Sequence, residues 1–174
     1  MDNPPTDSFT TTLPVVVFRY LPGQNPVEWR EIDRGPGIIQ FPTGDQLVVR
    51  ARNIGDAELK TLIHEIRDCK AITFLNLSEN RKTSDEGMRA LAEMPHLTGA
   101  NLSSCGLNDL GIERLIALTR LEHLNLSFCN RLTDLSLRHL RKLTRLTYLD
   151  LQGCVKVSQK GVAMLERKNL TIHR

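Results

Sequence analysis

The sequence predicts an α/β solenoid, in which a curved parallel sheet forms the inner face and helices form the outer face, with a short β-rich cap at the N-terminal end. Three observations carry this prediction. A segment recurs four times at intervals of 24 to 25 residues, a helix-start signal follows each copy, and the first 45 residues do not repeat. The 174 residues, 40% apolar and 25% charged, are typical of a globular protein with a sizeable core.

Each repeat opens with a short apolar strand that ends at an Asn or Cys. The four copies are Ile72–Asn80, Leu97–Cys105, Leu121–Cys129 and Leu146–Cys154. Alternation along a strand sends the central leucines inward, and the last residue of each copy is expected to anchor the turn that follows. A degenerate earlier copy has Leu47 and Val49 in its strand and Arg52 at the anchor.

The second half of each unit predicts a helix. Five residues favoured at the N-cap stand directly before the predicted helices: Gly55, Ser84, Asn108, Thr133 and Ser158. Four of the predicted helices then open with an aspartate, which suits the positive end of the helix dipole. Leu59, Leu62, Ile63 and Ile66 form an apolar stripe at helical spacing, and Pro95 is expected to stop the helix that begins near Asp85.

The pattern resembles the cysteine-containing leucine-rich repeats of substrate-receptor F-box proteins. Cys105, Cys129 and Cys154 occupy the anchor, and Asp-x-Gly opens the helices at Asp85 and Asp109. The resemblance covers residues 46–174 and implies a leucine-rich-repeat solenoid of about five units, with strands inside and helices outside. We therefore expect one structural domain, with residues 1–45 as the cap and 46–174 as the repeats.

The two ends of a solenoid need cover because terminal repeats expose apolar edges. The runs at 15–18, 27–29 and 38–41 predict short strands in the first segment, and Trp29, the only tryptophan, has the bulk to cover the first repeat. A docking hairpin is the alternative role for this segment. At the other end, residues 169–172 resemble the strand of an unfinished unit, whose edge could pair with a second copy of the chain.

No catalytic, metal or cofactor site is expected. The anchor cysteines form a linear column, which cannot supply the tetrahedral ligands of zinc, so we interpret them as buried structural thiols. His123 and Ser127 lie four residues apart on one strand, about 13 Å apart and beyond hydrogen-bonding reach. Phosphate-loop and metalloprotease motifs are absent from the sequence.

The outward residues of the strands are the candidate binding surface. Alternation places Asn76, Asn101, Asn125 and Asp150 in one outward column, beside a column of Ser78, Ser103, Ser127 and Gln152. Phe74, His123, Tyr148 and Phe128 flank these columns, and exposed aromatic rings beside hydrogen-bonding groups are typical interface anchors. The alternative is a solvated polar column with aromatic side chains packed on their neighbours.

Charge is unevenly distributed along the chain. Residues 1–80 carry a net charge of −3 and residues 81–174 a net charge of +6, with Arg138, Arg141, Lys142 and Arg145 around the fourth repeat helix. Such clusters can attract nucleic acid or anionic lipid, but no aromatic interleaving accompanies them, so nucleic acid is not the expected partner. The N-terminal residues lack a signal-peptide pattern, and we expect a cytoplasmic protein.

The function predicted from these observations is non-catalytic recognition of a protein partner, or scaffolding, on the concave face of the sheet. Two alternatives remain: an accessory assembly or coupling subunit of a larger complex, and a binder of nucleic acid or anionic surfaces through the basic helices.

Overall fold

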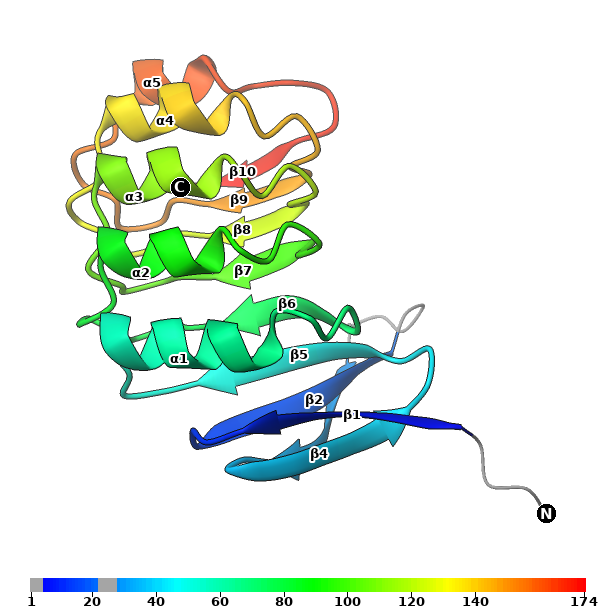
Figure 1. The fold of residues 1–174 in the computed structure, drawn as a ribbon. Helices are drawn as coiled ribbons and strands as arrows, with labels where there is room; N and C mark the ends of the chain where they lie inside the picture. The colour runs from blue at the N-terminus through cyan, green and yellow to red at the C-terminus, as the bar shows by residue number, and fades with distance from the viewer. Residues whose placement is uncertain (1–4, 22–27) are drawn as a thin grey trace.

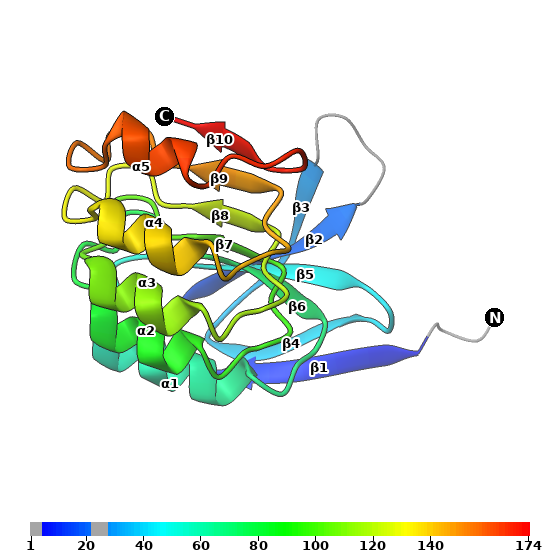
Figure 2. The same cartoon turned by 90° about the horizontal axis from the view of Figure 1, so that it is seen from above.

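The computed structural model describes residues 5–21 and 28–174 of the chain. Eight strands form one sheet in the order β10-β9-β8-β7-β6-β5-β2-β3, and β1 and β4 form a separate two-stranded sheet. Figure 1 shows helices α1 to α5 stacked in a layer on one side of the parallel strands, and Figure 2 shows β2 and β3 next to β5, at the end of the sheet opposite β10. The leucine-rich-repeat solenoid with a β-rich N-terminal segment is confirmed.

The repeats comprise short parallel strands and short helices. The strands are β5 (Gln46–Ala51), β6 (Ile72–Asn76), β7 (Gly99–Asn101), β8 (His123–Asn125), β9 (Tyr148–Asp150) and β10 (Thr171–His173). The helices are α1 (Asp56–Ile66), α2 (Asp85–Leu91), α3 (Asp109–Leu115), α4 (Asp134–Leu140) and α5 (Gln159–Ala163). Strand β10 forms one edge of the sheet but begins two residues later than the predicted 169–172, and α2 ends four residues before Pro95.

The anchor residues join each coil to the coil before it. The Sγ atoms of Cys105, Cys129 and Cys154 donate to main-chain carbonyl oxygens one coil earlier, over 3.1, 3.2 and 3.1 Å. Asn80 does the same through Nδ2, which lies 2.9 Å from the carbonyl oxygen of Ala51. The inward position predicted for the anchors is therefore confirmed, and each anchor adds a hydrogen bond between its own coil and the coil before it.

One anchor was assigned to the wrong residue by sequence. The parallel register pairs Val49 with Leu75, so the residue equivalent to Asn80 is Ile54 and not Arg52. Ile54 is buried, Arg52 is exposed, and the main-chain N–H of Ile54 donates to Oδ1 of Asn80 over 3.0 Å. Ile54 lies five positions after Val49, as Asn80 lies five positions after Leu75, so the assignment was displaced because Val49 and not Leu47 is equivalent to Leu75.

All five predicted N-caps are confirmed, and the aspartates that follow them do more than complement a helix dipole. Oδ1 of Asp109 accepts hydrogen bonds from the main-chain N–H groups of Thr133 and Ser136 in the next unit, over 2.9 and 3.1 Å. Asp56, Asp85 and Asp134 likewise accept from the N-cap main-chain N–H of the following helix. The carboxylates therefore link the helices of adjacent units.

This link explains the glycine of the Asp-x-Gly pattern. A Cβ atom added to Gly87 or Gly111 would lie 2.6 Å from Oδ1 of the aspartate in the preceding unit, so a side chain does not fit there. Ser136 occupies the equivalent place in α4 and instead donates its hydroxyl hydrogen to Asp109.

The N-terminal segment contains four strands, β1 (Thr6–Thr11), β2 (Val15–Leu21), β3 (Glu28–Arg34) and β4 (Gly37–Pro42). Strand β2 pairs antiparallel with β5, so the segment extends the sheet of the repeats. Val27, part of one predicted strand, lies outside the described residues, and β1 was not predicted because it contains a single large apolar residue, Phe9.

The apolar end of the first repeat is covered by β1 and β4 and not by Trp29. Phe9, Ile39 and Phe41 are buried in the same core cluster as the leucines of α1. The hydroxyl groups of Thr11 and Thr12 donate to the carboxylate of Glu65 on α1, over 2.8 and 2.5 Å. Trp29 lies instead on the other side of the sheet and remains 37% exposed.

Candidate functional site

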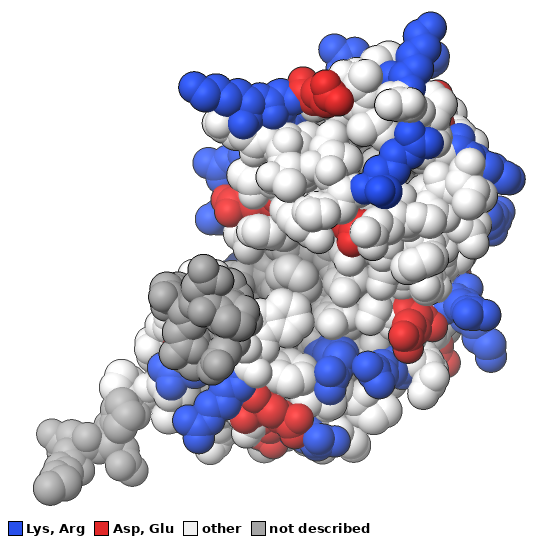
Figure 3. All heavy atoms as spheres, turned by 180° about the vertical axis from the view of Figure 1, so that it is seen from behind, with Lys and Arg blue, Asp and Glu red and all other residues white. Residues whose placement is uncertain are grey.

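The sheet face opposite the helices gathers most of the residues that sequence selected. Phe74, Gly99, His123 and Tyr148 are in register across adjacent strands, and so are Asn76, Asn101, Asn125 and Asp150. We call this surface the concave face. Figure 3 views the molecule from this side: the centre is largely free of charged residues, and Lys and Arg lie mainly around the margin.

The asparagine column has part of its hydrogen-bonding capacity already engaged. In Asn76, Asn101 and Asn125, Oδ1 accepts from the main-chain N–H two residues later, over 3.2, 3.0 and 2.9 Å. These bonds cap the ends of the strands. Among the described residues, no hydrogen bond engages the Nδ2 groups of the half-buried Asn76 and Asn101, so this column offers donors to a ligand more than acceptors.

Asp150 is less available than its neighbours in the column. Only 8% of it is exposed, and its two carboxylate oxygens face Gln152 N and Asn125 Nδ2, over 2.9 and 3.4 Å. Burial, followed by the charge of Asp150, raises the pKa of Tyr148. The phenol therefore stays protonated at neutral pH and is a hydrogen-bond donor beside the column.

Aromatic side chains form a row across the concave face. The Trp29 and Phe74 ring centroids are 5.1 Å apart, those of His123 and Tyr148 are 6.0 Å apart, and those of Tyr148 and His173 are 5.2 Å apart. Sequence selected the middle members, and strand order adds Trp29 from β3 and His173 from β10. The row spans repeat and N-terminal strands alike.

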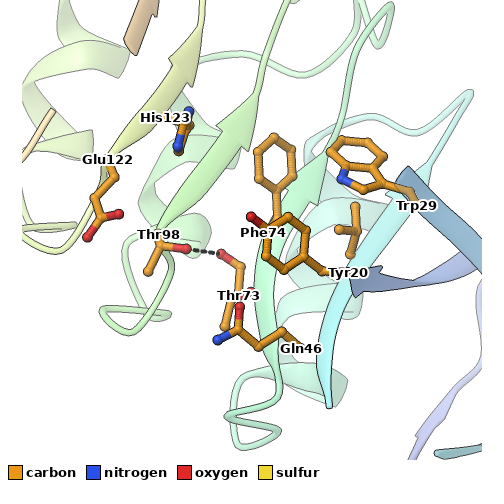
Figure 4. Close-up of a pocket in the computed structure, with 9 residues that line it drawn as sticks. Tyr20, Trp29, Gln46, Thr73, Phe74, Thr98, Glu122 and His123 are labelled. Carbon is orange, nitrogen blue, oxygen red and sulfur yellow. Dashed lines mark hydrogen bonds between the residues drawn. The ribbon is translucent and has the colours of Figure 1, made fainter. Parts of the chain in front are cut away.

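A cavity of about 490 Å³ opens in this row, between the hairpin of β2 and β3 and the repeat strands (Figure 4). It is lined by Tyr20, Trp29, Gln46, Val48, Thr73, Phe74, Thr98, Glu122 and His123. Figure 4 shows the rings of Tyr20, Trp29 and Phe74 side by side, with Glu122 and His123 across from them. The hydroxyl of Thr98 donates to the carbonyl oxygen of Thr73 over 3.3 Å.

Phe128 lies apart from the row, in the loop after β8. It is 58% exposed and has a positive φ of 60°, like Glu79 (67°), Ser104 (55°) and Gly153 (70°) at the same place in their units. A left-handed backbone costs a bulky residue on the order of 1 kcal/mol or more. Its ring packs over Gly153, where an added Cβ would collide with it.

Several chemistries find no support in the described residues. Within 5–21 and 28–174, no group of three or more His, Cys, Asp or Glu side chains could hold a metal ion, and no helix is long and apolar enough to cross a membrane. Burial raises the pKa of the Cys105 and Cys129 thiols to about 12, which suppresses the nucleophilic thiolate. The hydroxyl of Ser127 donates to Oδ1 of Asn125 over 2.7 Å, so it stabilises the turn that follows β8.

The basic residues lie around the fourth helix, away from the concave face. Arg138, Arg141, Lys142 and Arg145 are all exposed on or just after α4. Leu135, 47% exposed, is on the same helix. This convex surface is separate from the cavity and its aromatic row.

The parallel sheet, the outer helices and the ladder of anchors define a repeat protein of the leucine-rich class. Models of that family match the chain in two places: one described as Leucine Rich repeats (2 copies) matches residues 119–159, and one described as Leucine Rich repeat matches residues 68–92. The chain is therefore a leucine-rich repeat protein. No curated protein sequence matches it.

The chain also matches a number of solved structures, two of which follow. A chain in the crystal structure of the Rad7 and Elc1 complex in yeast is 19% identical, with a TM-score of 0.58 over 72% of this chain and 32% of that chain. This chain thus spans about a third of the length of that one. Internalin C2 from Listeria monocytogenes is 26% identical, with a TM-score of 0.46 over 62% of this chain and 43% of that chain.

Proposed function

We propose that the protein is a non-catalytic recognition module that binds a segment of a protein partner on its concave face. The observation that carries the proposal is the aromatic row, which places large, rigid contact surfaces beside amide donors on one continuous sheet. Aromatic side chains bury much area at low conformational cost and are enriched among interface hot spots. The similar chain of known structure comes from a protein complex, that of Rad7 and Elc1, which also supports a binding role.

Rigidity favours the same role. The anchor and aspartate ladders tie every coil to its neighbours, so the row is held in place before a partner arrives. A preorganised surface loses less conformational entropy on binding than a mobile one. We accordingly propose Phe74, Asn76, Asn101, His123, Asn125, Phe128, Tyr148 and Asp150 as partner-binding residues, with Asp150 acting chiefly by orienting Asn125.

The experiment compares the two sides of the molecule. The full chain is used to isolate its partner from the native cell, and variants are then measured against that partner by calorimetry after thermal melting has shown that each is folded. Phe74→Ala or Tyr148→Ala should each weaken binding by about 1 to 3 kcal/mol, or roughly 5- to 150-fold. The double variant Arg138→Glu, Arg141→Glu is the control and should change little beyond the association rate.

The second candidate function is binding of nucleic acid or an anionic surface, which the exposed basic residues of α4 favour. In that case the control variant abolishes binding, the two alanine variants do not, and the logarithm of the affinity falls steeply with that of the salt concentration. That ranking refutes the concave-face proposal.

A further inference from the structure

The cavity on the concave face has an unusual combination of walls. Three aromatic rings, those of Tyr20, Trp29 and Phe74, come from three strands, β2, β3 and β6. Among the described residues that line the cavity, Glu122 is the only carboxylate, and none is Lys or Arg. Ring faces carry negative electrostatic potential, so rings and carboxylate together favour a positively charged occupant.

Two arginines near this cluster, Arg50 and Arg19, are already engaged. The guanidinium group of Arg50 lies 4.7 Å from the ring centroid of Phe18, and the Phe18 ring packs against Trp29 at 6.3 Å between centroids. Arg19 forms an ion pair with Asp45 at 2.6 Å. The aromatic cluster thus holds one cation at its inner end, while the Phe74 end borders the cavity and is open to a ligand.

The polar groups around the cavity suit a compact cation with several donors. The Thr98 hydroxyl donates to the Thr73 carbonyl and keeps its oxygen lone pairs free to accept. An ammonium group has three donors and no acceptor, whereas a guanidinium group prefers a planar, bidentate carboxylate. Val48 beside the rings offers apolar contact for a methylene stem.

We propose that this cavity binds a lysine side chain of the protein partner, with the ammonium group between Glu122 and the aromatic rings. The proposal rests on the function proposed above and adds the chemistry of one residue in the partner. The methylene stem packs along Phe74 and Trp29, and the ammonium group reaches the carboxylate and the threonine hydroxyls.

Gly99 helps to shape the site. It is buried on β7, and an added Cβ would meet the Phe74 ring, so the ring lies across β7 at this point. A residue with a side chain at 99 would push the ring from its present position. Gly99→Ala is therefore a way to displace Phe74 without deleting it.

The test uses two short peptides and the single tryptophan of the chain. The full chain is titrated with acetyl-Gly-Gly-Lys-Gly-Gly-amide and with the same peptide carrying norleucine, which keeps the stem and lacks the ammonium group. Fluorescence of Trp29, the only tryptophan in the sequence, reports binding. The lysine peptide should give a saturable change and bind at least about fivefold more tightly than the norleucine peptide.

Matched variants assign the effect to the site. Glu122→Gln should remove most of the preference for lysine, and Gly99→Ala should weaken binding of the lysine peptide by at least about threefold. Glu113→Gln removes the same charge from an exposed position on α3 and should leave both affinities unchanged. Circular dichroism verifies that each variant is folded.

Three results overturn the proposal: equal affinity for the two peptides, no saturable change with either, or an effect of Glu113→Gln as large as that of Glu122→Gln. None of these alters the partner measurement with Phe74→Ala and Tyr148→Ala. Conversely, if Phe74→Ala and Tyr148→Ala bind the native partner as the parent does, the peptide titration still measures the preference for lysine. The two proposals therefore fail on separate measurements.

Discussion

Substitution of Asp109 tests the carboxylate link between units. In Asp109→Ala, the Thr133 main-chain N–H loses its acceptor, the carboxylate oxygen at 2.9 Å. The Ser136 N–H keeps a second bond, to the Thr133 carbonyl oxygen at 3.0 Å, so the loss centres on Thr133. The two hydroxyl groups that donate to Asp109 also lose their acceptor.

The expected cost follows from these bonds. A hydrogen bond to a charged group contributes about 1.5 to 3 kcal/mol, and an unpaired amide costs a similar amount, so Asp109→Ala should lower the free energy of unfolding by about 2 to 3 kcal/mol. For a domain of this length that corresponds to a fall in Tm of roughly 4 to 12 °C. Asp109→Asn keeps an oxygen for both amides and should cost about half as much.

Urea denaturation followed by circular dichroism measures the difference. The matched control is Glu113→Ala, which removes a carboxylate from an exposed position of the same helix and should stay within about 0.5 kcal/mol of the parent. A double-mutant cycle of Asp109→Ala with Ser136→Ala should show coupling of about 0.5 kcal/mol or more. If Asp109→Ala costs no more than the control, the carboxylate does not stabilise the stack of helices.

The remaining predictions concern the thiols, the N-terminal segment and pH. Cys69, which is partly exposed, should react first with a thiol reagent in the native state, while the three buried anchor cysteines react slowly. Cys129→Arg should lower the free energy of unfolding by about 3 kcal/mol or more because it buries an unpaired charge. An unchanged Tm would contradict this. Deletion of residues 1–45 removes β2 from the edge of β5 and uncovers the core next to α1. The truncated protein should therefore aggregate or melt at a much lower Tm in calorimetry. A soluble fragment of parental stability would make the segment a docking element and not a cap. Burial opposes ionisation of Asp109, but its four hydrogen bonds outweigh burial and lower the pKa in the folded state, and hydrogen bonds from Ser158 lower that of Asp134. A carboxyl group whose pKa lies below the unfolded value of about 3.9 stabilises the fold at neutral pH, and this stabilisation is lost as pH falls through the folded pKa. Tm should therefore drop below about pH 4, and the drop should be less steep in Asp109→Asn.

Local patterns in the sequence were sufficient to predict the solenoid. The spacing of leucines defines which side chains point inward, because strand alternation depends only on neighbouring residues. The N-caps were correct at Ser84, Asn108 and Thr133 for the same reason, since a cap bonds to an amide two or three residues away. The outward columns of the concave face also followed from alternation, so the sequence alone was enough to select most of the candidate binding residues.

Contacts between distant parts of the chain were decided by the tertiary structure alone. Trp29 joins Phe74 because β3 pairs with β2 and β2 with β5, an order that the sequence of strands does not reveal. The same pairing places Tyr20 and Glu122 around one cavity. The aspartates were interpreted as partners of a helix dipole, whereas their acceptor role depends on the helix of the next unit, 23 to 28 residues further on. Alternation and capping act within a few residues and are therefore legible in sequence, while strand order and the stacking of units arise only when the whole chain packs.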